Sequence, residues 1–264
     1  MLAGISTACF YPLYTEEAVQ KLSRIPPQCV EVFLNARHEL DPAYLRELRR
    51  RADAAGILIK SIHPYTSGME PMYFFSNYDR RFAEGIEIYR DFYQAANILG
   101  AGIVVFHGGI RHFNLDYDDY FARFERLWLD AKKHGVDLCQ ENVQRCTSYT
   151  PEFFKAMAAA LPDVGYVLDT KQAVRAGEDV YSFADSMSTR IRHVHISDHS
   201  PAHDCLAPGK GVLNIAKLLS IITKNGFDGS VIVELYRENF NDFVELERGY
   251  QQVFTAISTI LKND

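Results

Sequence analysis

The chain has 264 residues, of which 47% are hydrophobic, and its formal net charge is −6. This length and composition suffice for one large core, and α/β barrels of about 250 residues commonly form a single domain. Because acidic and basic residues are well mixed, the charge pattern argues against a protein that binds nucleic acid or a membrane surface.

Strand and helix patterns alternate along the whole chain. Eight short and mostly apolar segments are typical of parallel strands buried on both faces. They are Ala3–Cys9, Cys29–Leu34, Ile57–His63, Ile103–His107, Val136–Glu141, Tyr166–Asp169, Arg192–Ser197 and Val231–Leu235. Helix patterns fill the gaps, over residues 16–24, 42–55, 80–99, 117–134, 151–160, 179–187, 214–225 and 242–262.

The alternation, repeated eight times, predicts a single-domain (β/α)8 barrel, also called a TIM barrel. A doubly wound open sheet is the competing fold, but no glycine-rich phosphate loop follows the first strand. Helix ends are marked by Asp41 with Pro42 at one start, by Asp79 as an expected cap, and by Gly100 at one end. The longest irregular segments are expected at about 64–78, 108–115 and 198–213.

Four residues that can bind a metal each lie at the end of an apolar run: Glu141, Asp169, His195 and Glu234. Their spacing is close to the length of one strand–helix unit, about 30 residues. In a barrel they would therefore emerge at the same end of successive strands, where active sites lie. Three carboxylates and one imidazole gathered there would repel one another without a cation. The pattern predicts a divalent metal site in an enzyme.

Seven segments, in this order and spacing, resemble the xylose isomerase-like barrel superfamily, which contains sugar phosphate isomerases and epimerases and class II AP endonucleases. They are Ser61–Tyr65, Val105–Gly108, Glu141–Val143, Leu168–Thr170, His193–Asp198, Pro208–Gly211 and Val231–Tyr236. The resemblance implies a metal bound by Glu141, Asp169, His195 and Glu234, with the two glutamates also acting as acid and base.

The sequence departs from two branches of that superfamily. The nucleases need a histidine where this chain has Gln172, and an Asp-x-His where it has His203–Cys205, so a three-zinc site and a DNA repair nuclease are disfavoured. The ketose epimerases typically carry an arginine shortly after the equivalent of His195, and Asp198–Ala202 offers none. An AP endonuclease-like nuclease remains the alternative from a different class.

Three oxygen ligands and one nitrogen ligand favour Mn2+, Mg2+ or Co2+, and admit Zn2+. One divalent ion would polarise the carbonyl of a ketose or hydroxycarbonyl compound and stabilise an enediolate. Of Glu141 and Glu234, one would remove the proton next to the carbonyl and the other would return it. Epimerisation and aldose–ketose isomerisation both follow from this chemistry, for a sugar, sugar phosphate or related polyol ketone. An inosose-type dehydratase is a further alternative, because its reaction also begins by removing the proton next to a carbonyl to give an enolate.

Four further residues are candidate substrate contacts. His63 and His107 follow strand patterns and are expected either to contact substrate or a second cation, or to be hydrogen-bonded histidines of the pocket wall. Gln172 is a candidate partner for a sugar hydroxyl. Lys210, in a Gly-Lys-Gly turn, is a candidate phosphate contact, because barrels often bind phosphate near strands seven and eight.

The remaining signals concern the compartment and the partners. Five scattered cysteines include no Cys-x-x-Cys pair, and no lysine or arginine precedes Lys21. These features indicate a reducing compartment and no signal peptide, so the cytoplasm is expected. The expected partner is a small carbohydrate, without nucleic acid or membrane, in a chain that is a candidate homo-oligomer. The aromatic residues Tyr73–Phe75 and Tyr78 are expected to cover the pocket or to form a helix-packing patch.

Overall fold

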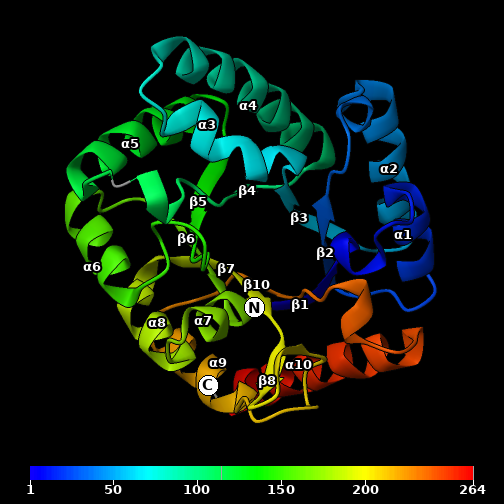
Figure 1. Cartoon of the computed structure of the whole chain (residues 1–264). Helices are drawn as coiled ribbons and strands as arrows, with labels where there is room; N and C mark the ends of the chain where they lie inside the picture. Colours follow the sequence, from blue (N-terminus) through cyan, green and yellow to red (C-terminus); the bar gives the residue numbers. More distant parts are fainter. Residues whose placement is uncertain (114, 264) are drawn as a thin grey trace.

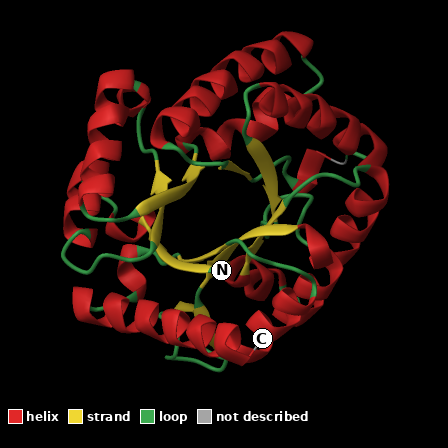
Figure 2. Cartoon of the chain, turned by 180° about the vertical axis from the view of Figure 1, so that it is seen from behind, coloured by secondary structure: helices red, strands yellow, loops and turns green. Residues whose placement is uncertain are grey.

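The computed structural model describes residues 1–113 and 115–263, and its centre is a closed barrel of eight parallel strands ringed by helices (Figure 1, Figure 2). This confirms the predicted α/β barrel. Around the barrel, the strand order is β1-β10-β7-β6-β5-β4-β3-β2. The strands are β1 Leu2–Ser6, β2 Cys29–Phe33, β3 Leu58–His63, β4 Ile103–Phe106, β5 Asp137–Glu141, β6 Tyr166–Asp169, β7 Ile191–Ile196 and β10 Ser230–Val233.

Eight helices match the predicted ones to within a few residues. They are α1 Thr15–Leu22, α2 Pro42–Ala54, α4 Asp79–Leu99, α5 Tyr117–Lys133, α6 Pro151–Ala160, α8 Val180–Met187, α9 Ile215–Lys224 and α10 Phe243–Asn263. Asp41 caps α2, since its carboxylate accepts from the backbone N–H groups of Ala43 and Tyr44. Gly100 ends α4 with a left-handed φ of 75°. Asp79 is the first residue of α4 and not its cap, because the flanking residue is Tyr78.

Several elements that the sequence pattern did not predict follow the carboxyl ends of strands. The first strand ends at Ser6, whose hydroxyl accepts from the Ala8 N–H and begins a 3-10 turn. These additional elements are η1 Thr7–Phe10, η3 Tyr65–Met69, α3 Glu70–Phe74, α7 Thr170–Ala176, and the hairpin of β8 Asp198–Ser200 and β9 His203–Leu206. The other 3-10 turns are η2 Arg37–Leu40, η4 Arg111–Phe113, η5 Ser188–Arg190 and η6 Arg237–Asn239. The segments 64–78 and 198–213, which were expected to be irregular, therefore contain short helices and strands. Within the third expected irregular segment, 108–115, Asn114 lies outside the described residues.

The main apolar core fills the space between the barrel and the helices. Phe74 and Phe75 are buried in it, and the Phe75 ring stacks on Tyr120 at 4.4 Å between centroids. These two residues therefore form a helix-packing patch and do not cover the pocket. The inside of the barrel also holds buried polar groups, including Glu31 and His193. No helix in the described ranges has the length and apolar composition needed to cross a membrane.

Candidate metal centre and active-site cavity

The four predicted ligand residues lie together at the carboxyl end of the barrel. Glu141 and Asp169 are the last residues of β5 and β6, His195 is the next-to-last residue of β7, and Glu234 directly follows β10. One ligand atom from each lies within 4.8 Å of the ligand atoms of the other three. The barrel register causes this, because it places Asp169 directly opposite His195 on the neighbouring strand.

The atoms of this cluster fit a divalent cation. His195 Nδ1 lies 3.2 Å from Glu141 Oε1 and 3.6 Å from Glu234 Oε2. Glu141 Oε2 and Asp169 Oδ2 are buried and accept no hydrogen bond of good geometry within the described residues, and each has one cationic or imidazole neighbour: His107 Nε2 at 2.9 Å and Lys171 Nζ at 3.5 Å, respectively. Buried polar atoms rarely lack a well-aligned hydrogen bond, and carboxylate oxygens are the ligands that hard cations prefer. The donor set of three carboxylates and one imidazole therefore fits a metal ion.

Neighbouring groups hold two of the ligands in position. The other oxygen of Asp169, Oδ1, accepts from the Gln172 N–H and caps α7, which leaves Oδ2 directed at the cluster. Asn142 fixes the Asp169 backbone, because its Oδ1 accepts from the Asp169 N–H at 2.7 Å and its Nδ2 donates to the Asp169 carbonyl at 2.8 Å. His195 Nε2 lies 3.0 Å from Glu31 Oε2. A proton on that nitrogen leaves the Nδ1 lone pair facing the carboxylates.

Lys171 places a positive charge beside the cluster, and it was not among the four candidate substrate contacts expected from the sequence. Its Nζ lies 2.8 Å from Glu234 Oε2 and 3.5 Å from Asp169 Oδ2, and 4.6 Å from the centre of the Tyr236 ring. Only 4% of the side chain is exposed. The sequence feature that could have identified Lys171 is its position two residues after Asp169. It lies in the first turn of α7, a helix that the sequence pattern did not predict.

The charges of the cluster shift several pKa values. Burial raises the pKa of Asp169 to about 7. Burial acts in the same direction on Glu234, but Lys171 and His195 outweigh it and hold the Glu234 pKa below its ordinary value. Burial also opposes ionisation of Glu141, yet His107 and His195 keep its pKa well below the ordinary range. Both glutamates are therefore carboxylates at neutral pH.

The candidate substrate residues occupy different places. His63 Nε2 lies 2.9 Å from His107 Nε2, which in turn lies 2.9 Å from Glu141 Oε2. The three side chains form a second group with metal-ligand spacing. Contact with substrate or a second cation, and a role as hydrogen-bonded pocket-wall residues, both stay predictions for the two histidines. Gln172 lines the cavity, and its Oε1 accepts from the Gln144 N–H.

Lys210 is not among the residues that line the cavity, and its role as a phosphate contact stays a prediction. Its side chain is 54% exposed, and its Nζ lies 3.8 Å from Glu245 Oε1 on α10. The hairpin that follows β7 causes this placement. The Asp198 carboxylate accepts from the N–H groups of Gly209, Gly211 and Leu213 and holds the Gly-Lys-Gly turn beside the hairpin.

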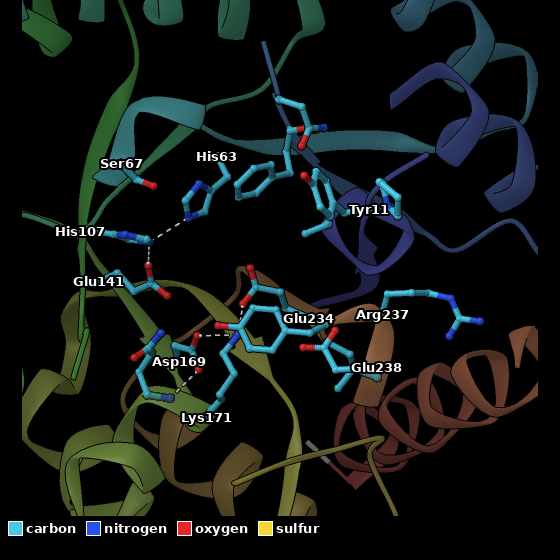
Figure 3. A pocket seen from close by; sticks show the side chains of 17 residues that line it. Tyr11, His63, Ser67, His107, Glu141, Asp169, Lys171, Glu234, Arg237 and Glu238 are labelled. Carbon is cyan, nitrogen blue, oxygen red and sulfur yellow. Dashed lines mark hydrogen bonds and ion pairs between the residues drawn. The ribbon is translucent and has the colours of Figure 1, made fainter. Parts of the chain in front are cut away.

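A cavity of about 770 Å3 opens above the cluster. Figure 3 shows His107, Glu141 and Asp169 at one side of it and Tyr11 and Arg237 at the other. Phe33 and Tyr236 also line the cavity, and the Phe33 ring stacks on His63 at 4.6 Å. Sequence analysis did not identify Tyr11 and Tyr236 as wall residues. The available signal was that both lie shortly after strand ends, close to where the candidate ligand residues lie.

Comparison with known proteins gives one family and several distant relatives. The family described as xylose isomerase-like TIM barrel matches residues 19–259. An uncharacterized protein of Mycobacterium bovis is 23% identical over 257 residues, which cover 88% of each chain. An inosose isomerase of Halalkalibacterium halodurans is 27% identical over 121 residues, which are 42% of this chain and 43% of that protein.

Two solved structures share the fold along nearly the whole chain. A D-tagatose 3-epimerase-like protein superposes with a TM-score of 0.82 at 19% identity, covering 100% of this chain and 99% of the other. The IolI protein, solved with a zinc atom bound, has a TM-score of 0.76 at 18% identity and covers the same shares.

Proposed function

Because the chain belongs to the xylose isomerase-like TIM barrel family, we propose that it is a divalent-metal-dependent isomerase or epimerase of a sugar, sugar phosphate or related polyol ketone. The observation that carries this proposal is the convergence of four buried or nearly buried ligand side chains, each with a ligand atom within 4.8 Å of the others, at one end of the barrel. The zinc atom in the IolI structure and the epimerase name of the other structural relative support it.

Two glutamates approach the cluster from different directions. Glu141 ends β5 and Glu234 follows β10, and β6 and β7 lie between these strands in the barrel. A substrate held between them would present a different face to each carboxylate. One carboxylate removes the proton on the carbon next to the carbonyl, and the other returns a proton.

A bound divalent cation would polarise the substrate carbonyl and stabilise the negative charge of the enediolate. The protein supplies the remaining parts. The lowered pKa values of Glu141 and Glu234 keep both groups ionised, so either can accept the substrate proton. The glutamate that returns a proton must first take one up from solvent, and this is the route by which deuterium would enter the product. Return of the proton to the opposite face of the same carbon inverts it, and return to the neighbouring carbon moves the carbonyl.

Metal analysis followed by solvent exchange tests the proposal. The purified protein is stripped with a chelator and reloaded with Mn2+, Mg2+, Co2+ or Zn2+. It is then incubated in D2O with a panel of ketoses, ketose phosphates and cyclic polyol ketones. We expect metal-dependent deuterium incorporation next to the carbonyl of at least one class. No incorporation with any loaded metal across the panel would reject the proposal.

An inosose-type dehydratase is the second candidate, and the partial similarity to an inosose dehydratase of Lacticaseibacillus casei, 27% identical over 144 residues, favours it. It shares the first proton abstraction but then expels a hydroxyl group as water. Incubation with a cyclic polyol ketone separates the two readings: a dehydratase yields a product that is lighter by one water, whereas an isomerase or epimerase yields a product of unchanged mass.

A further inference from the structure

The cavity continues well past the metal-binding residues. Beyond Tyr11 lies a second cavity of about 380 Å3, which shares Tyr11, Pro12 and Arg237 with the first. Aromatic residues from two distant segments, Phe10 and Phe243, line this second cavity. Tyr11, Pro12 and Arg237 therefore lie between the two cavities.

A single sugar ring leaves much of this space unfilled. A hexose has twelve non-hydrogen atoms, and at about 30 Å3 for each, the space of one water molecule, it fills at most about 360 Å3. The first cavity alone has about 770 Å3. The remaining volume is sufficient for a second ring.

Aromatic rings form the walls of the remaining space. Tyr11 is 63% exposed and Tyr236 is 40% exposed, and both line the first cavity. Pro12 and Phe33 complete this aromatic subsite, which we define as Tyr11, Pro12, Phe33 and Tyr236. Exposed ring faces grouped at a pocket mark a binding surface, because they stack on flat or ring-shaped apolar groups.

The charges favour a neutral substituent over a phosphate. Lys171 and Arg237 line the first cavity and carry a fixed positive charge. Lys171 is paired with Glu234, while Arg237 donates to the Phe240 carbonyl at 2.8 Å and lies over the Phe240 ring. The second cavity is lined by one lysine, Lys21, and one aspartate, Asp242. Both cations of the first cavity are therefore engaged by protein groups.

We propose that the substrate is a glycoside of a keto-sugar, whose second ring binds in the aromatic subsite. This inference rests on the proposed function, because the ketone must reach Glu141 and Glu234. In a glycoside the anomeric carbon is locked as an acetal, so the ketone lies at another ring carbon. A 3-keto-glucoside has a hydroxyl on each of the two carbons next to the ketone and suits a site that binds a carbonyl with an adjacent hydroxyl.

Methyl and phenyl 3-keto-β-D-glucosides, which differ only in the second ring, provide the test. We expect kcat/KM for deuterium exchange to be about tenfold higher for the phenyl compound, the effect of one good ring–ring contact. Tyr11→Ala should bring this ratio close to one. Tyr14→Ala is the matched control, because Tyr14 is 66% exposed in the same segment and lies outside the residues that line the first cavity; it should keep the ratio.

A binding measurement separates the subsite from the reaction. Phenyl β-D-glucoside has no ketone, and calorimetric titration should show tighter binding to the wild type than to Tyr11→Ala. If this holds but no ketone exchanges deuterium, the subsite stands and the proposed function fails. If exchange occurs but methyl and phenyl compounds react equally, or fructose 6-phosphate reacts fastest, the glycoside proposal is overturned and the proposed function stands.

Discussion

Glu31 Oε2 lies 3.0 Å from His195 Nε2, although the two residues are 164 positions apart in the chain. The same oxygen lies 3.1 Å from His193 Nε2 and accepts from the Ser61 hydroxyl at 2.8 Å. All of these side chains are buried. Glu31 therefore selects the His195 tautomer whose Nδ1 faces Glu141 and Glu234.

Replacing Glu31 tests this orientation. In Glu31→Gln the amide no longer enforces a proton on His195 Nε2, so we expect metal affinity to fall by about 10-fold to 100-fold while the fold persists. Calorimetric metal titration gives the affinity. Asp130→Asn is the control, because Asp130 is a largely buried carboxylate that pairs with Arg90 on the outer helices. Equal affinity in the wild type and Glu31→Gln would show that Glu31 has no orienting role.

If Glu141 and Glu234 are the acid–base pair, their replacement should reduce turnover far more than metal binding. Glu141→Gln and Glu234→Gln each keep a ligand oxygen but lose the basic carboxylate. We expect exchange rates to fall by about 10²-fold to 10⁴-fold in each variant while part of the bound metal remains. Metal content and deuterium exchange are measured on the same samples. A variant that binds metal and exchanges at the wild-type rate would remove that glutamate from the mechanism.

Lys171 offsets the negative charge of the metal-free cluster. Breaking a buried ion pair leaves uncompensated charge, so Lys171→Met should lower the free energy of unfolding of the metal-free protein by on the order of 3 kcal/mol. The same loss of positive charge should strengthen metal binding, and added metal should therefore raise the melting temperature more than in the wild type. Thermal unfolding with and without metal measures both effects.

Lys210→Met is the matched control for this variant. Lys210 is largely exposed and 3.8 Å from Glu245, so its loss should change stability by less than about 0.5 kcal/mol. If Lys171→Met and Lys210→Met had the same stability and the same response to metal, Lys171 would have no electrostatic role in the cluster.

Glu70 on α3 predicts a pH dependence of stability. Its Oε2 accepts from the Gly108 N–H at 2.6 Å, its Oε1 accepts from the Tyr89 hydroxyl, and burial raises its pKa to about 7. Below about pH 4.5 both folded and unfolded states hold the proton. Between about pH 4.5 and 7 only the folded state holds it, so stability falls as pH rises, by on the order of 3 kcal/mol in total.

Glu70→Gln imitates the protonated carboxyl, because its oxygen can accept from Gly108 while its amide donates to Tyr89. We expect this variant to lack that part of the decline and to be more stable than the wild type above pH 7. Urea unfolding at pH 4.5 to 8 measures the difference between the two proteins, in which other titrating groups cancel. Parallel stability curves would contradict the assignment to Glu70.

The sequence by itself determined the barrel and the four clustered residues. Apolar runs, caps such as Asp41 and the terminal glycine Gly100 are local signals, and they define strands and helices without distant information. A closed parallel barrel then brings all carboxyl strand ends to one rim. The convergence of Glu141 and Asp169 with their two partners therefore followed from counting residues along the chain.

Only the tertiary structure decided what surrounds these residues. The contact of Glu31 with His195, the place of Lys171 and the outward turn of Lys210 depend on strand register and on short elements that follow the strands. A local sequence pattern does not specify these contacts, because the neighbours of a side chain across the barrel come from segments far away in the sequence. The aromatic subsite arises in the same way, from Tyr11 near the start of the chain and Tyr236 near its end.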